Sequence, residues 1–427
     1  MNNPLKKITR GIPSYCCANE IVIEAIFEHY KNNNAPVLIE GTANQINQNG
    51  GYTGMKPNDF KNYIYSIADR LKFPHERIII GGDHMGPLFW SELKSDEAMS
   101  NAKELVKLCV MAGFKKIHLD TSMKLADDPV NERLSDDVIA ERGAVLFKAC
   151  EEAYQELLKQ NPDEIRPVYI IGSEVPIPGG VQDSQTGLQV TSVKEFENTL
   201  KAYETQFKNY GIYQRFIDVI GVVVQPGVEF GDHYIHHYER VKAKDLCAAL
   251  KNYSGIVFEG HSTDYQTREK LREMVEDGVK ILKVGPALTF ALREGLFALS
   301  MIENELIKNN NDRANFINTL ENEMLLNPKH WEKYYHGSES YKDLARKYSY
   351  SDRSRYYLNV PEVKNSIRKL FNNVDENISK LIPGLLKQFM PVQYKKVMSG
   401  EIKLNARSLV HDYISQVVDD YNSAVKN

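Results

Sequence analysis

Cysteine is scarce in this sequence, and the few cysteines that occur are scattered. The 427 residues include 5 cysteines, an odd number, and no two of them have C-x-x-C spacing. This excludes a disulfide framework and a thiolate zinc site, because both need patterned cysteines. Such usage is typical of a reducing compartment, and we expect a cytoplasmic protein. The cysteines are Cys16, Cys17, Cys109, Cys150 and Cys247.

Long apolar runs and basic tracts are also missing. No segment approaches the ~20 apolar residues that a membrane-spanning helix requires, and the start, MNNPLKKITRG, lacks the apolar core of a secretory signal. The formal net charge is -4, and lysine and arginine form no tract longer than a few residues. We therefore expect neither a membrane nor a nucleic acid as a partner.

Three common catalytic signatures are absent as well. The sequence has no G-x-x-x-x-G-K-[ST] phosphate loop, no G-x-G-x-x-G dinucleotide fingerprint and no G-x-S-x-G nucleophile elbow. The composition is ordinary for a globular protein, with 42% hydrophobic and 26% charged residues. These absences argue against three large enzyme classes and leave other chemistries open.

What the sequence does contain is a regular alternation of short apolar runs and amphipathic stretches. Residues 96–113 and 192–211 have helical periodicity, and Ser192 with Glu195 has the pattern of a capping box. Alternating strands and helices predict an α/β protein with parallel strands, and eight strands would close a (β/α)8 TIM barrel; an open doubly wound sheet is the alternative. The predicted strands are residues 11–17, 36–42, 77–83, 116–122, 167–174, 218–227, 255–262 and 281–287.

The pattern changes near residue 308. The polar segment KNNNDR, residues 308–313, interrupts the alternation, and the chain beyond it has helical character with aromatic clusters. We expect residues 1–307 to form the barrel with the active-site mouth. Residues 308–427 are expected to form a C-terminal helical extension packed on the barrel.

Polar and ionisable residues gather where the predicted strands end. Capping and turn residues would explain scattered Asn, Asp, Ser and Gly, but not a Glu or His on strand after strand. The carboxyl ends of the strands carry the catalytic groups of a TIM barrel, so we expect these residues to meet at one mouth. They are Glu40, Asn44, Gln45, Asp83, His84, His118, Asp120, Ser122, Glu174, Gln225, Glu259, His261, Ser262, Asp264 and Lys283.

The pair Asp83 and His84, in the segment RIIIGGDHMGP, suits metal-assisted chemistry. Two imidazoles on different strands, with carboxylate or amide oxygens nearby, can hold one divalent ion with an open position. Such an ion polarises a carbonyl and stabilises an enediolate, and Asp83 could move a proton without being a ligand. The histidines of HYIHHYE, residues 233–239, follow a predicted loop and are the weaker candidates.

Eight segments carry a resemblance that runs from about residue 11 to beyond residue 390, and several of them exceed eight residues, which makes chance similarity implausible. They are PVLIEGTANQINQNGGYTGMKP, IIIGGDHMGP, KIHLDTSM, GSEVPIPGG, VVVQPGVEF, GHSTDYQT, KVGPALTFALRE and YSYSDRSRYY. They resemble the successive signatures of the Z subunits of D-tagatose-1,6-bisphosphate aldolase, from galactitol and N-acetylgalactosamine catabolism. The resemblance implies a class II aldolase-type barrel and a cytoplasmic bacterial enzyme of ketohexose-phosphate metabolism, with zinc as the expected metal.

The resemblance also implies roles for single residues. By comparison with class II aldolases, Asp83 is the acid/base, and His84 and His261 bind the metal. Gln225 stands where those enzymes have a further metal histidine and is the third expected metal ligand, and Glu174 is a second catalytic candidate. Pro286 lies in the loop where they grip a phosphate with backbone N–H groups, which proline lacks. The expected substrate-binding residues are Glu40, Asn44, Gln45, Asp120, Glu259, Ser262, Asp264, Lys283, Arg353 and Arg355.

The two arginines of YSYSDRSRYY lie in the predicted extension. We expect one of them, Arg353 or Arg355, to reach the barrel mouth and bind a phosphate, because a guanidinium suits anion contact. The alternative is that both arginines pair with surface carboxylates.

Two functions remain open. The first is a metal-dependent enzyme acting on tagatose or fructose phosphates, by retro-aldol cleavage or by cleavage and recombination that inverts C4. The second is a non-catalytic accessory subunit that stabilises a separate class II tagatose-bisphosphate aldolase subunit. The charged strand ends favour the enzyme, because unpaired buried charges cost on the order of several kcal/mol. We also expect a homo-oligomer.

Overall fold

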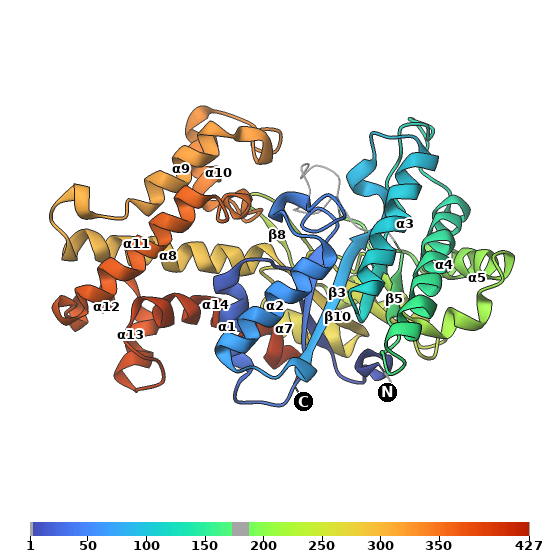
Figure 1. Cartoon of the computed structure of the whole chain (residues 1–427), viewed down its shortest axis with the longest axis horizontal. Coiled ribbons are helices and arrows are strands. Elements are labelled where there is room, and N and C mark those ends of the chain that lie inside the picture. Colours follow the sequence, from blue (N-terminus) through green and yellow to red (C-terminus); the bar gives the residue numbers. More distant parts are fainter. Residues whose placement is uncertain (1–2, 173–187, 427) are drawn as a thin grey trace.

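A computed structural model of the protein describes residues 3–172 and 188–426. Eight parallel strands form a closed barrel in the order β1-β10-β9-β6-β5-β4-β3-β2 (Figure 1). The predicted TIM barrel is therefore confirmed, and the open doubly wound sheet is excluded. The strands are β1 (Ile12–Tyr15), β2 (Val37–Thr42), β3 (Ile78–Met85), β4 (Lys116–Leu119), β5 (Val168–Ile171), β6 (Val219–Val224), β9 (Val257–Gly260) and β10 (Val279–Val284).

A helix follows each barrel strand and covers the outside of the barrel. Residues 96–113 and 192–211 form α3 and α5 as predicted, and Ser192 and Glu195 make the reciprocal hydrogen bonds of a capping box. No helix of the described residues is long and apolar enough to cross a bilayer. The helices are α1 (Glu20–Tyr30), α2 (Pro57–Leu71), α3 (Ser95–Met111), α4 (Asp136–Gln160), α5 (Val193–Asn209), α6 (Arg240–Leu250), α7 (Arg268–Glu276) and α8 (Pro286–Leu306).

The alternation of side chains along each strand separates an apolar layer from a polar one inside the barrel. Leu38 of β2 and Ile281 of β10 belong to the apolar cluster of the barrel interior. Side chains two positions apart point to the same face of a strand. Glu40, two residues after Leu38, and Lys283, two residues after Ile281, therefore also face the interior. The polar layer therefore lies nearer the carboxyl ends of the strands, which form the mouth of the barrel.

The chain beyond residue 308 forms an arm of helices on one side of the barrel and then returns to it (Figure 1). α11 packs on α8 and α9, whereas α14 packs on α1, α7 and α8. A short two-stranded sheet, β7 (Glu229–Phe230) with β8 (Ile235–His236), follows β6. The helices of the arm are α9 (Phe316–Leu326), α10 (Glu339–Tyr348), α11 (Pro361–Glu376), α12 (Pro383–Phe389), α13 (Pro391–Met398) and α14 (Ala406–Val425).

A buried ion pair holds the segment between α10 and α11 of this arm against α8. Arg293 of α8 is 1% exposed, and its Nε lies 3.0 Å from Oδ1 of Asp352. Asp352 also accepts a hydrogen bond of 2.5 Å from the hydroxyl of Thr289. Asp352 directly precedes the short 3-10 helix Arg353–Tyr356, so these contacts fix the segment that carries both predicted phosphate-binding arginines.

Candidate functional site

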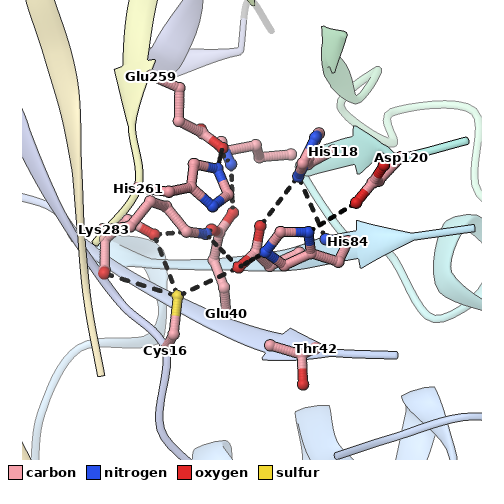
Figure 2. Close-up of polar contacts among 12 residues, drawn as sticks. Cys16, Glu40, Thr42, His84, His118, Asp120, Glu259, His261 and Lys283 are labelled. Carbon is pink, nitrogen blue, oxygen red and sulfur yellow. Dashed lines mark hydrogen bonds and ion pairs between the residues drawn. The ribbon is translucent and has the colours of Figure 1, made fainter. Parts of the chain in front are cut away.

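Three histidines and one carboxylate meet at the barrel mouth. Asp83 and His84 come from β3, His118 from β4, and His261 directly follows β9. Each of the four offers one ligand atom, and these atoms all lie within 4.8 Å of one another. The centroid of the His84 ring lies 5.1 Å from that of His118 and 4.8 Å from that of His261. Figure 2 shows the three rings together. All four residues are buried.

Two of the imidazoles are oriented by carboxylates behind them (Figure 2). Nδ1 of His84 lies 2.8 Å from Oδ2 of Asp120, and Nε2 of His261 lies 2.9 Å from Oε1 of Glu259. A carboxylate only accepts hydrogen bonds, so both of these ring nitrogens carry the proton. When these two imidazoles are neutral, Nε2 of His84 and Nδ1 of His261 are the nitrogens that carry a lone pair, and Nε2 of His84 lies 3.7 Å from Oδ2 of Asp83.

The third imidazole, His118, is oriented in the same way, by a backbone carbonyl oxygen in place of a carboxylate. Its Nε2 lies 3.2 Å from the carbonyl oxygen of Gly172, and this nitrogen therefore donates. Its Nδ1 accepts a hydrogen bond of 3.3 Å from the backbone N–H of His84, yet it also lies 3.1 Å from Oδ1 of Asp83. Two acceptors thus face each other, and this repulsion is relieved by a cation or a proton between them.

These donors fit a divalent metal ion. Metal-binding histidines characteristically donate their other ring N–H to a carboxylate or a carbonyl, which fixes the tautomer and the ring orientation. Three imidazoles with one open position are a frequent catalytic zinc set. His84, His118 and His261 are three imidazoles whose other ring nitrogens are held in this way, so they fit such a set.

The charges around the cluster keep Asp83 ionised. Burial raises the pKa of Asp83, but His84 and Lys283 beside it outweigh burial and hold the pKa well below its usual range. Burial lowers the pKa of His261 to about 4, so this imidazole is neutral at pH 7. Burial also lowers the pKa of His84, but Asp83 and Asp120 outweigh it and raise the pKa overall.

Two buried lysines, Lys116 and Lys283, connect the carboxylates next to the cluster, and Figure 2 labels Lys283 beside Glu40. Nζ of Lys116 lies 2.8 Å from Oε1 of Glu40 and 2.7 Å from Oε2 of Glu259. Nζ of Lys283 contacts Glu40 and lies 3.1 Å from Oδ2 of Asp83. The carboxylate of Glu259 that orients His261 is therefore itself held by Lys116, and Lys283 links Glu40 to Asp83.

Glycine at position 81 makes room for this network. A Cβ at Gly81 would lie 2.4 Å from Oε1 of Glu40, closer than any side chain tolerates. The pair of glycines before Asp83 in the β3 sequence is therefore partly explained by the buried carboxylate of the neighbouring strand.

The backbone is strained where the site residues turn inward. His84, Ser262, Tyr265 and Asp352 have φ of 49°, 51°, 62° and 43°, in the left-handed region that costs a non-glycine residue about 1–3 kcal/mol. The pairing of β3 with β4 shifts between Gly82 and Met85. β3 continues to Met85, two residues past the predicted end at Asp83, so Asp83 and His84 lie within an irregular strand end.

The cluster opens into a cavity between the barrel and the arm. Asp83, His84, His261 and Lys283 line it from the barrel, and Arg355 lines it from the arm. Nη1 of Arg355 lies 3.0 Å from the carbonyl oxygen of Asp352, and it makes no salt bridge with any of the residues that the structure describes. The other predicted substrate-binding residues on the cavity wall are Asn44, Gln45, Ser262 and Asp264.

Other predicted site residues lie behind the cavity wall or away from it. Glu40, Asp120 and Glu259 hold the lysines and histidines described above. The guanidinium of Arg353 lies 3.3 Å from the centroid of the Tyr334 ring and is not among the residues of the cavity wall.

Two predicted site residues, Gln225 and Glu174, are not among the described residues of the cluster, for different reasons. Gln225 does not join the histidines, because its Oε1 accepts hydrogen bonds of 2.8 and 2.9 Å from the backbone of Gly227 and Val228. Glu174 lies outside the described residues, and its catalytic role stays a prediction.

The sequence prediction gave no role to three residues of the site. His118 belongs to the strand-end residues but was not predicted as a ligand, although its spacing of two from Asp120 places both side chains on one face of the strand. Lys116 precedes it on the same face, with its side chain fully buried. Sγ of Cys16 lies 3.7 Å from Oδ2 of Asp83 and on the cavity wall. The period-two spacing of 116, 118 and 120 is the signal that would have found the first two.

Comparison with known proteins agrees with the resemblance found in the sequence. Residues 2–426 match the family described as D-tagatose-1,6-bisphosphate aldolase subunit GatZ/KbaZ-like. A crystal structure from Sinorhizobium meliloti 1021, described as a probable tagatose 6 phosphate kinase, is 42% identical, covers 97% of this chain and 100% of its own, and has a TM-score of 0.88.

Two further solved structures are much less similar. The fructuronate-tagaturonate epimerase UxaE from Cohnella laeviribosi is 12% identical, with 98% of this chain and 82% of that chain covered and a TM-score of 0.44. The YdjI aldolase from Escherichia coli K12 is 10% identical, with 86% and 94% covered and a TM-score of 0.39. Both similarities are too weak to carry an argument about chemistry. The family match and the 42% identical structure are sufficient, and the chain belongs to the D-tagatose-1,6-bisphosphate aldolase subunit GatZ/KbaZ-like family.

Proposed function

We propose that the cavity at the barrel mouth is the active site of a metal-dependent enzyme acting on phosphorylated ketohexoses. The observation that carries this proposal is the set of three imidazoles, each with one nitrogen occupied by an outer acceptor, beside an ionised carboxylate. His84, His118 and His261 would hold the ion, with zinc as the proposed metal. When bound, the ion supplies Lewis-acid chemistry, because it polarises a carbonyl and stabilises negative charge on oxygen.

Asp83 is the proposed proton acceptor. It lies on the cavity wall and is ionised, so it can take the proton of the C4 hydroxyl as the bond between C3 and C4 breaks. Lys283, 3.1 Å away, holds the carboxylate in place. Release of the aldehyde product gives an aldolase; return of the aldehyde on its other face, with Asp83 giving the proton back, gives the C4 epimer.

Arg355 is the proposed phosphate-binding group. Its side chain lines the cavity, and the acceptors it contacts are backbone carbonyls and the hydroxyl of Tyr356 rather than a carboxylate. A guanidinium without a carboxylate partner is free to bind a phosphate through paired, charge-assisted hydrogen bonds.

The test of this function is a direct assay of the isolated protein. Fructose 6-phosphate is incubated with the zinc-loaded protein, and ¹³C NMR follows tagatose 6-phosphate and three-carbon products. We expect conversion that a chelator abolishes and added zinc restores. Absence of conversion with each common divalent ion, in a protein that retains no metal after purification, would falsify the proposal.

Replacing Arg355 with methionine is expected to weaken binding of phosphorylated substrates selectively. Loss of a charged hydrogen-bonding group costs about 1.5–3 kcal/mol, so KM for fructose 6-phosphate should rise roughly 10- to 100-fold. Arg353→Met is the matched control, because this neighbour packs on Tyr334 outside the cavity. Steady-state kinetics of both variants measure the two KM values. A larger rise in KM for Arg353→Met than for Arg355→Met would show that Arg355 is not the phosphate-binding arginine.

The accessory role is the second candidate function, and the word "subunit" in the family description favours it. Large apolar side chains exposed on α9 and α10 support a proposed contact with a catalytic aldolase subunit or with a second copy of the chain. They are Leu325, Leu326, Leu344 and Tyr348. Light scattering of the purified protein, alone and mixed with a class II tagatose-bisphosphate aldolase, tests both assemblies; two unassociated monomers would contradict them.

A further inference from the structure

We propose that Asp264 is a specificity-determining residue that restricts the cavity to substrates with a single phosphate group. The inference rests on the proposed function and concerns the same cavity. It comes from the carboxyl end of the barrel, where Asp264 follows β9 and meets the start of α8.

The start of α8 is a position where TIM barrels commonly bind phosphate, because helix N-terminal N–H groups attract anions. Here these donors are already used. Oδ1 of Asp264 accepts hydrogen bonds of 3.0 Å from Gly285 and 2.8 Å from Ala287. Pro286 has no N–H, and the N–H of Leu288 donates to the carbonyl oxygen of Gly285 at 3.1 Å. A phosphate would therefore find no free donor among these four residues.

Asp264 also opposes a phosphate by its charge. It is 3% exposed and lies on the cavity wall. Burial raises the pKa of Asp264 to about 6, and the residue is still mostly ionised at pH 7. A phosphate at the start of α8 would meet a like charge and would deprive the buried carboxylate of both hydrogen-bond donors, and each of these effects is costly.

The number of free cationic side chains in the cavity also limits the substrate to one phosphate group. Among the described residues, the lysine and arginine that line the cavity are Lys283 and Arg355. Lys283 is already paired with Glu40 and Asp83, which leaves Arg355 as the free cation. Residues 173–187, which the structure does not describe, contain neither lysine nor arginine. One phosphate can be neutralised by this set, and a second cannot.

Binding of two uncleavable probes tests the proposal. D-Glucitol 6-phosphate and D-glucitol 1,6-bisphosphate lack the carbonyl group, so isothermal titration of the zinc-loaded full chain reports affinity without turnover. We expect the wild type to prefer the monophosphate by about 10-fold. Asp264→Ala, which frees the two N–H groups and removes the charge, should shift the ratio by roughly 100-fold toward the bisphosphate.

Two further variants make the test specific. Asp264→Asn removes the charge, but its amide oxygen can still accept from the two N–H groups, so we expect a smaller shift in the same direction. If Asp264→Ala does not fold, the ratio measured with Asp264→Asn tests the proposal. Asp420→Asn, whose carboxylate pairs with the exposed Arg268, is the control and should leave the ratio unchanged.

The possible failures can be told apart. A wild type that binds the bisphosphate as tightly as the monophosphate, or an unchanged ratio in both Asp264 variants, overturns the role of Asp264 and leaves the proposed enzyme intact. Failure of the folded, zinc-loaded wild type to bind either probe contradicts the proposed function itself.

Discussion

Substitution of Asp83 by alanine is expected to abolish turnover while the metal stays bound. Asp83 is the ionised group on the cavity wall that the proposed reaction uses for proton transfer, whereas His84, His118 and His261 supply the proposed ligands. Loss of a general base typically costs about 10²–10⁴-fold in rate. The rate is measured by NMR with fructose 6-phosphate, and zinc content by mass spectrometry on the same preparation.

Two variants give this result its meaning. His84→Ala removes a proposed ligand and should lose both the metal and the activity. Asp127→Ala removes an exposed carboxylate that accepts hydrogen bonds from Ser95 and does not line the cavity, and should change neither. An Asp83→Ala protein that keeps wild-type turnover, or that loses its metal as completely as His84→Ala, would contradict the division of roles between Asp83 and the histidines.

Substitution of Lys116 by methionine is expected to lower the free energy of unfolding by about 3–5 kcal/mol. Lys116 is fully buried, and its ammonium group bridges the equally buried carboxylates of Glu40 and Glu259. Methionine has nearly the same shape but no charge, so Glu259 would lose the ammonium group that it contacts, and Glu40 would keep Lys283 as its cationic partner and Ser14 as a hydrogen-bond donor. Equilibrium denaturation followed by circular dichroism measures the loss.

The adjacent residue offers a closely matched control. Lys115 pairs with Glu164 at the other face of the strand, and both side chains are partly exposed, at 18% and 17%. Pairs nearer the surface contribute at most about 1 kcal/mol, so Lys115→Met should cost much less than Lys116→Met. Equal losses in the two variants would show that the buried network does not stabilise the fold in the way we describe.

The barrel was predictable because it depends on regularities within short segments. The apolar runs, the helical periodicity of 96–113 and 192–211, and the capping box at Ser192 all appear in the structure at the predicted positions. Strand–helix alternation and the count of eight were sufficient for the closed sheet. The carboxyl ends of parallel strands share one edge, so the meeting of Asp83, His84 and His261 could also be predicted.

The composition of the ligand cluster was less predictable, because it depends on the direction of single side chains. Gln225 ends a strand as His118 does, but its amide oxygen caps the backbone of Gly227 and Val228. His118 faces the cluster because the carbonyl oxygen of Gly172, the residue directly after β5, accepts its Nε2 proton. A local contact in the loop after β6 turns the amide of Gln225 away, whereas a contact with the residue after β5 orients His118. The spacing of 116, 118 and 120 could place His118 on the inner face, but nothing in the sequence shows that Gln225 turns away.

The sequence by itself determined the barrel and the residue types at its mouth, since both follow from periodicity within segments of fewer than about twenty residues. Only the tertiary structure decided how distant segments combine. Arg355 reaches the cavity because Asp352 is bound by Arg293 and Thr289 of α8. Asp264 occupies the start of α8 because two N–H groups, from residues more than twenty positions away, converge on one carboxylate oxygen. Contacts of this kind depend on the packing of the folded chain, which fixes directions and distances that a linear pattern leaves free.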